Sequence, residues 1–157
     1  MLYKQQSFSN FEPDLRYLDS FPFSREEFLF FDIETTGFSP RNTSLYLIGA
    51  VCFLDEHWTF LQWFAETPSE ECEILNAFLA FCRSFRAVVH FNGDGFDIPY
   101  LLFKAEKYTL SDTLSSMQSI DLYRLTRPYK KYLKLTHINQ KSLSLALSGK
   151  TATTAAN

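Results

Sequence analysis

Residues 28–37 read FLFFDIETTG (Phe28–Gly37) and are the most informative stretch of the chain. Its apolar first half predicts a buried strand, which ends in the acids Asp32 and Glu34. Side chains two residues apart in a strand point to the same face, so both carboxylates leave one face near the strand's end. Two like charges close together are costly unless a cation lies between them. The pattern favours a divalent metal site, with solvated acids at a strand end as the alternative.

A second acidic stretch is HFNGDGFD (His90–Asp97), which follows the apolar segment 87–89. It predicts a short strand, an Asn/Gly turn and a helix that begins near Asp97. Because helix N-termini stabilise carboxylates, Asp97 alone could be a cap. Together with Asp32 and Glu34 it would complete an all-oxygen ligand set of the kind that Mg²⁺ or Mn²⁺ prefers.

The composition is that of one globular domain. The chain has 157 residues, with 17 Phe and 8 Tyr but only 5 Gly and 6 Pro, which argues against a disordered or fibrous protein. Three cysteines without a CxxC pair exclude a zinc knuckle and a disulfide framework. No signal-peptide core or membrane-length apolar run is present. We therefore expect a cytoplasmic protein with reduced core thiols and no membrane partner.

Periodicity predicts an α/β order of elements. Three strands, at 28–34, 45–54 and 58–64, are joined by short links and predict an antiparallel meander. A helix should begin at Thr67-Pro68-Ser69-Glu70, with Thr67 as its cap and Glu70 closing the capping box. The remaining elements expected are an irregular leader over 1–27 with one short helix near 14–20, strands at 87–91 and 117–123, helices at 97–107 and 141–147, and a disordered tail over 151–157.

Two motifs resemble those of a known family. Asp-Ile-Glu-Thr-Thr-Gly at 32–37 is similar to the first motif of the DEDD exonucleases, and Asn92-x-x-x-Phe96-Asp97 is similar to their second. The spacing of these motifs and the sequence character of residues 28–147, including Ser119-Ile-Asp-Leu-Tyr-Arg124, most resemble those of the YprB-like branch. The resemblance implies a ribonuclease H-like domain over 28–150, with a mixed sheet, an antiparallel three-strand meander and helices on the sheet's faces.

The resemblance also implies roles for individual residues. Asp32 would bridge two divalent ions (Mg²⁺ or Mn²⁺), Glu34 would bind one of them, and Asp97 would support the other. The substrate would be the 3′ end of a single-stranded DNA or RNA. Residues implied on the substrate side are Thr35, Thr36, Gly37, Phe38, Asn92, Phe96 and Arg124.

One part of the family pattern is missing. Its third motif supplies a last Asp with a Tyr or His nearby, whereas Asp121 is the final acid of this sequence. This suggests a truncated or altered C-terminus and leaves three functions open. They are a two-metal 3′→5′ exonuclease, a catalytically weak domain that binds single-stranded nucleic acid, and a structure-selective or integrase-like nuclease completed by Asp121. His137 has no acid nearby and is expected to be a polar surface residue.

Charge is distributed unevenly along the chain. Residues 1–120 carry 8 Lys and Arg against 17 Asp and Glu, whereas residues 121–157 carry 7 against 1. Such asymmetry hints at contact with a polyanion. The basic residues Arg124, Arg127, Lys130, Lys131 and Lys134 alternate with Tyr123, Tyr129 and Tyr132. They could hold a single strand through phosphate contacts and stacking, or form a solvated surface.

Overall fold

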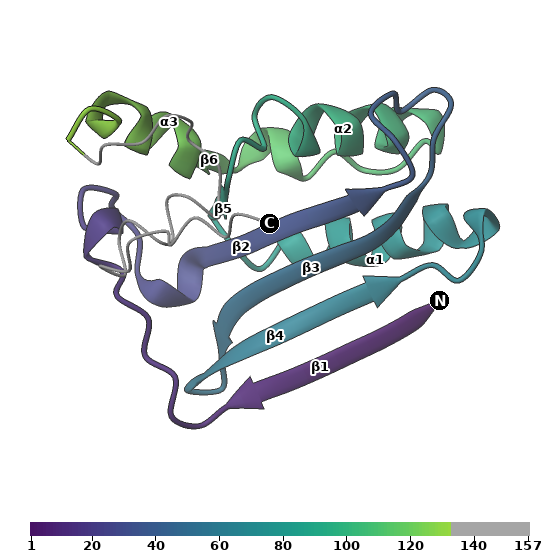
Figure 1. The fold of residues 1–157 in the computed structure, drawn as a ribbon. Helices are drawn as coiled ribbons and strands as arrows, with labels where there is room; N and C mark the ends of the chain where they lie inside the picture. The colour runs from purple at the N-terminus through teal and green to yellow at the C-terminus, as the bar shows by residue number, and fades with distance from the viewer. Residues whose placement is uncertain (133–157) are drawn as a thin grey trace, which may run out of the picture.

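The computed structural model describes residues 1–132 and shows one mixed six-stranded sheet with helices (Figure 1). The strand order is β1-β4-β3-β2-β5-β6. The strands are β1 (Leu2–Phe8), β2 (Phe28–Thr35), β3 (Leu45–Leu54), β4 (His57–Phe64), β5 (Ala87–His90) and β6 (Gln118–Asp121). The α-helices are α1 (Glu71–Cys82), α2 (Asp97–Lys107) and α3 (Leu122–Thr126). The predicted α/β class is confirmed.

The predicted meander is also confirmed. β2 pairs antiparallel with β3, and β3 pairs antiparallel with β4. Asp55 and Glu56 connect β3 to β4 with φ angles of 48° and 62°, the left-handed conformation that tight hairpin turns require. β5 and β6 run parallel to β2, so the ends of β2 and β5 point the same way.

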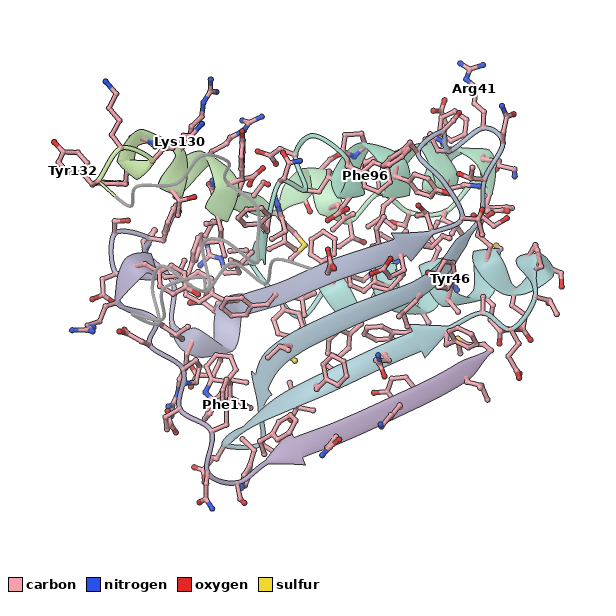
Figure 2. All side chains as sticks on the ribbon, viewed as in Figure 1. Phe11, Arg41, Tyr46, Phe96, Lys130 and Tyr132 are labelled. Atoms are coloured by element: carbon pink, nitrogen blue, oxygen red, sulfur yellow. The ribbon has the colours of Figure 1, made fainter. Side chains whose placement is uncertain are left out.

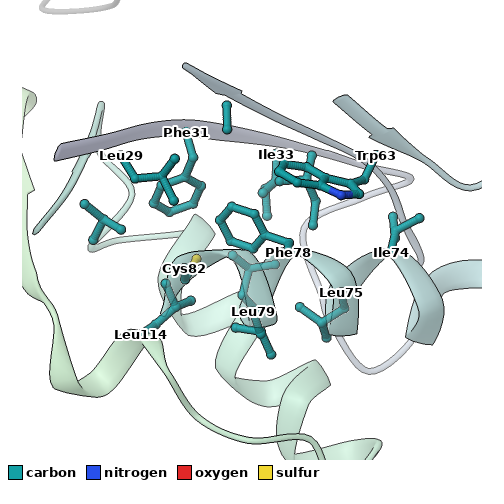
Figure 3. Close-up of a cluster of buried hydrophobic side chains, with 14 of the residues drawn as sticks. Leu29, Phe31, Ile33, Trp63, Ile74, Leu75, Phe78, Leu79, Cys82 and Leu114 are labelled. Atoms are coloured by element: carbon teal, nitrogen blue, oxygen red, sulfur yellow. The ribbon is translucent and has the colours of Figure 1, made fainter. Parts of the chain in front are cut away.

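Strand alternation divides β2 between two environments. Leu29, Phe31 and Ile33 are buried and pack against α1, where Phe78 lies 5.4 Å from Phe31 between ring centroids (Figure 3). Burying a side chain of this size contributes about 1.5–3 kcal/mol to the stability of the folded protein. Asp32 and Glu34, at the intervening positions, are exposed on the opposite side. We call that side, away from α1 and α2, the open face.

Among residues 1–132, side chains cover the open face at one end only. A second apolar cluster joins Phe28, Val89 and Ile120 of the sheet to Leu18 from the segment between β1 and β2. This cluster lies at the start of β2, whereas Asp32 and Glu34 lie near its end. The acids are therefore left accessible.

Three expectations differ from the structure. The leader is not irregular throughout, because Leu2–Phe8 forms β1 along β4. All seven of its residues are exposed, so no hydrophobic alternation marked it as a strand. The short helix expected near 14–20 is a single 3₁₀ turn, Arg16–Leu18.

The capping box at Thr67 is absent as well. Thr67 makes no side-chain cap, and Glu70 accepts instead from the backbone N–H of Glu66 at 2.8 Å. A 3₁₀ turn, Pro68–Glu70, precedes α1. The helix expected at 141–147 and the tail at 151–157 lie outside the described residues. Within residues 1–132, no helix has the length and apolar character needed to cross a bilayer.

Candidate metal and nucleic-acid site

Asp32 and Glu34 border a cleft of about 370 Å³ on the open face. Asp32 pairs with Gly49 of β3, and Gly49 pairs with Gln62 of β4. Gly49 has no side chain, and a Cβ placed there would meet only the Phe60 ring, at 3.8 Å. The sheet surface beside Asp32 is therefore hollow, with room for a ligand next to the two carboxylates.

Asp97 comes to this region through a tight turn after β5. Asn92 adopts φ 60°, a left-handed conformation that Asn tolerates well. Gly93 then lies so close to His90 that a Cβ would be 2.5 Å from the ring Nδ1. The carbonyl of Gly93 accepts from the N–H of Ile98 at 2.9 Å, and α2 begins at Asp97. The turn thus places the Asp97 side chain, only 5% exposed, at the head of α2.

The electrostatics connect Asp97 with the acids of β2. Burial raises the pKa of Asp97 to about 7, and the charges of Asp32, Asp121 and Glu34 add to this effect in that order. The pKa of Asp32 is also raised, first because the neighbouring sheet surface partly removes this otherwise exposed carboxylate from water and then by the charge of Glu34. These carboxylates therefore share one field, in which a full set of negative charges is unfavourable.

The three predicted ligands do not form a closed cluster. Among residues 1–132, the group whose potential ligand atoms all lie within 4.8 Å of one another is His90, Asp94 and Asp121. Sequence reasoning missed this group because β5 and β6 join only in the folded sheet. Asp32, Glu34 and Asp97 are more widely spread, and their role as ligands remains a prediction.

The atoms of the His90 group are engaged in hydrogen bonds. The Nδ1 atom of His90 accepts from the N–H of Gly93 at 3.0 Å, so the ring proton is on Nε2, which donates to Ser119 Oγ at 2.7 Å. Ser119 in turn donates to Asp94 Oδ1 at 2.6 Å. Burial lowers the pKa of His90 and favours this neutral ring. The arrangement holds the turn that leads to Asp97.

Asp121 anchors the same turn from β6. Its Oδ1 accepts from the N–H of Asn92 at 2.8 Å and of Tyr123 at 3.0 Å, while Oδ2 accepts from the N–H of Asp94 at 3.3 Å. Asp121 is therefore the N-cap of α3 and a clamp on the turn. These contacts favour a structural role over that of the ligand that an integrase-like site would need.

Four of the predicted substrate residues, Thr35, Thr36, Gly37 and Phe38, lie at the end of β2 and in the loop that follows it, whereas Asn92 lies in the turn after β5, Phe96 at the head of α2 and Arg124 on α3. Thr35 Oγ1 donates to the carbonyl of Gly37 at 2.9 Å, and Thr36 Oγ1 accepts from the N–H of Ser44, also at 2.9 Å. The next side chain, Phe38, is 90% exposed, with its ring centroid 6.0 Å from that of Phe96. The loop and the head of α2 thus present one aromatic surface near Asp97.

The basic segment predicted to bind nucleic acid continues from α3. Arg124 Nη1 lies 3.2 Å from Asp94 Oδ2, and in Figure 2 Lys130 and Tyr132 project outward. Arg127, Lys130, Lys131, Tyr129 and Tyr132 are all exposed. Lys134 and His137 lie outside the described residues. The side chains available for phosphate contacts and stacking therefore lie on the flank of the site that contains β6.

The donor set fits a divalent cation. Asp32 and Glu34 offer carboxylate oxygens on the open face, and their negative charges add to the effect of burial in raising the pKa of Asp97. Hard cations such as Mg²⁺ and Mn²⁺ take such oxygen ligands and offset such charge. Two ions about 3.5–4 Å apart can also be held by carboxylates that do not all touch one another.

Comparison with solved structures finds several proteins with a similar fold. The chain is similar to the family B DNA polymerase from the archaeon Pyrobaculum calidifontis, with TM-score 0.51, 17% identity, and coverage of 65% of this chain and 16% of that one. It is also similar to E. coli exonuclease I in complex with a dT13 oligonucleotide, with TM-score 0.50, 19% identity, and coverage of 71% and 31%. A zinc-bound complex of E. coli exonuclease I with single-stranded DNA gives TM-score 0.50, 17% identity and the same coverage.

The chain spans less than a third of the length of each of these proteins, and at such identities the likeness concerns the fold. No curated protein matches the sequence. A family model described as the RNase_H superfamily matches residues 29–154, which include Leu29–Thr35 of β2, the turn after β5 and, in the part that the structure describes, helices α1, α2 and α3. On this match and the mixed sheet, the chain belongs to the RNase H superfamily.

Proposed function

We propose that this domain is a metal-dependent 3′→5′ exonuclease that hydrolyses phosphodiester bonds at single-stranded 3′ ends. The observation that carries the proposal is the position of Asp32 and Glu34 on the open face of β2, in one electrostatic field with the buried Asp97. The RNase H fold supports a nuclease, and structural neighbours include exonuclease I bound to single-stranded DNA.

The residues would act as follows. Asp32 would bind both divalent ions, Glu34 would bind one, and Asp97 would give its carboxylate to the other. Bound ions of this kind supply activation of water and neutralise charge on the phosphate and the leaving 3′ oxygen. Exposed Phe38 would stack on the terminal base, since aromatic rings bind bases of any sequence. The backbone of Gly37 would approach the terminal nucleotide.

The test is release of nucleotides from labelled single-stranded DNA and RNA in Mg²⁺ or Mn²⁺, with label at either end to give the direction. Asp32→Asn should lower the rate by more than about 100-fold, because even a group that only supports a metal ligand is worth roughly 10- to 100-fold. The matched control is Asp55→Asn. Asp55 is exposed in the β3–β4 turn at φ 48°, which Asn adopts readily. Equal rates for Asp32→Asn and Asp55→Asn would refute the proposal.

A second candidate is a domain that binds single-stranded nucleic acid with little catalysis. It is favoured by the exposed basic and aromatic side chains after α3, among them Arg127, Lys130 and Tyr132, since phosphate contacts and base stacking need no metal. Calorimetry with Mn²⁺ separates the two candidates. Measurable Mn²⁺ affinity that Asp32→Asn removes supports the exonuclease, whereas salt-sensitive strand binding without metal affinity supports the binding domain.

A further inference from the structure

The loop between β2 and β3 is held by an ion pair that is buried between α1 and α2. Lys104 Nζ of α2 lies 2.8 Å from Glu71 Oε1 of α1, and the two side chains are 1% and 2% exposed. Removing two charges from water is costly, so such a pair persists only where its other polar atoms are hydrogen-bonded as well. The partners of those atoms show what the pair does.

Both charged groups bind the backbone where the loop returns to β3. Lys104 Nζ donates to the carbonyl of Thr43 at 2.6 Å. Glu71 Oε1 accepts from the N–H of Leu45 at 2.7 Å, and the Tyr108 hydroxyl donates to Oε2. The pair therefore does more than join two helices, because it fixes residues 43–45 through both a carbonyl and an N–H.

Thr43 connects the fixed residues 43–45 to the first half of the loop, at residues 37–39. Its hydroxyl donates to the carbonyl of Ser39 at 2.6 Å and lies 2.9 Å from the Tyr100 hydroxyl and 3.1 Å from the carbonyl of Gly37. Gly37 is packed directly on it, since a Cβ there would come within 2.9 Å of Thr43 Cγ2. The position of Thr43 thus sets the position of Gly37.

The residue after Gly37 is Phe38, the exposed ring beside Phe96. Phe96 itself lies 5.6 Å from the ring of Tyr100, which also meets Thr43. A continuous path of contacts therefore leads from the ion pair through Thr43 to the loop residues that would meet a 3′-terminal nucleotide.

We propose that Glu71 and Lys104 are positioning residues, which hold the 36–44 loop through Thr43 so that Gly37 and Phe38 are ordered before a nucleic-acid 3′ end binds. The inference rests on the proposed function for its substrate. Its structural part, the order of the loop, can be tested without any activity.

The first variant is Thr43→Val, which removes the hydroxyl and keeps the shape, the Thr43 carbonyl and the ion pair. Thr59→Val is the matched control, because the Thr59 hydroxyl is buried and bonded to Ser7 at 3.1 Å between β4 and β1. Thr43→Val should speed amide hydrogen exchange over 36–45 by about tenfold, as loss of a hydrogen bond of ordinary strength predicts. Thr59→Val should leave exchange in this segment unchanged.

The second variant is Glu71→Gln with Lys104→Met, which removes both charges together so that neither remains buried alone. The folded double variant should also show faster exchange over 36–45.

On single-stranded oligonucleotides, Thr43→Val should raise KM by about tenfold with kcat within about twofold, the pattern of lost ground-state binding. Mn²⁺ affinity should not change, since the metal ligands are untouched.

Unchanged exchange over 36–45 in Thr43→Val overturns the inference, whatever the state of the double variant. If the protein degrades no strand at all but exchange rises as expected, the proposed function fails and the loop restraint stands. If nuclease activity is present but neither exchange nor KM responds, the restraint fails and the proposed function stands.

Discussion

The carboxyl group of Asp97 at the head of α2 lies within the electrostatic reach of Asp32 on β2. After burial itself, the charge of Asp32 is the strongest influence that raises the pKa of Asp97, to about 7. The two residues come from elements that are separated by β3, β4, α1 and β5 in the chain. Because of this coupling, a measurement of the protonation of Asp97 tests whether α2 and β2 are arranged in this way.

The metal-free protein should lose stability through Asp97 as the pH rises. The ordinary pKa of this group is 3.8 and the folded value is about 7, so between these values the folded state holds more protons than the unfolded state. The free energy of unfolding therefore falls with increasing pH across this window. Denaturant unfolding in EDTA should show Asp97→Asn gaining stability relative to the unsubstituted protein between pH 5 and pH 8.

Asp97→Asn and the unsubstituted protein must be compared at each pH, because the titration of His90 changes the free energy of unfolding in the opposite direction. Burial lowers the pKa of His90 below its ordinary 6.5, so its contribution is lost as the pH falls below that value. Asp55→Asn, on the exposed turn, should keep a constant difference from the unsubstituted protein. A constant difference for Asp97→Asn as well would contradict the burial of a coupled carboxyl group.

Metal affinity should depend on pH through the same group. A metal ligand must be deprotonated, so an ion that binds Asp97 has to displace the proton that this carboxyl holds below about pH 7. Calorimetric Mn²⁺ affinity should therefore weaken as the pH is lowered from 8 to 6. Proton release, measured in buffers of different ionisation enthalpy, should accompany binding at pH 6 and disappear in Asp97→Asn.

Much of this arrangement is visible in the sequence because its signals are local. The apolar run that ends in Asp32 predicts β2, and the helical spacing of four apolar residues, all of them buried, predicts α1; these are Ile74, Leu75, Phe78 and Leu79. The turn between His90 and Asp97 has its own Asn and Gly residues. For each of these elements, the local sequence is sufficient to favour the structure that forms.

The parts that sequence did not reveal depend on pairing between distant segments. Strand β1 is exposed at every position and is specified by its ladder with β4. The bonds from Asp121 to the turn after β5 form only when β5 and β6 lie side by side. The buried pair of Glu71 and Lys104 joins two helices whose polar members resemble ordinary solvated charges when read one at a time.

Gly93→Ala should destabilise the protein. The new methyl group would lie 2.5 Å from His90 Nδ1, and forcing extra volume into a packed site typically costs about 1–3 kcal/mol. Gly95→Ala is the matched control in the same turn, where a Cβ would lie 3.3 Å from Asn92 Oδ1. Denaturant unfolding should rank the control well above Gly93→Ala in stability. The opposite order would show that His90 does not constrain the turn.

Asp121→Asn should lower stability by about 1–3 kcal/mol, because an amide nitrogen cannot accept and at least one part-buried N–H would lose its partner. Asp112→Asn tests the same change at an exposed carboxylate, which accepts a single bond from the N–H of Ser115 at 3.0 Å, and should cost less. Denaturant unfolding and Mn²⁺ calorimetry are measured together. Loss of metal affinity at unchanged stability would instead make Asp121 a ligand, as an integrase-like nuclease requires.

Salt dependence should identify the exposed basic segment after α3 as the surface that holds the strand. Each phosphate contact with a single strand adds about 0.7 to the slope of log affinity against log salt. If Arg127 and Lys130 each make one, Arg127→Gln with Lys130→Gln should weaken binding and lower the slope by about 1.4. Arg83→Gln with Lys107→Gln changes net charge equally, from exposed sites near the ends of α1 and α2. An equal fall in slope for both double variants would mean that strand binding follows overall charge. A fall confined to Arg127→Gln with Lys130→Gln would place the strand beside α3, on the flank where Asp121 anchors the turn before Asp97.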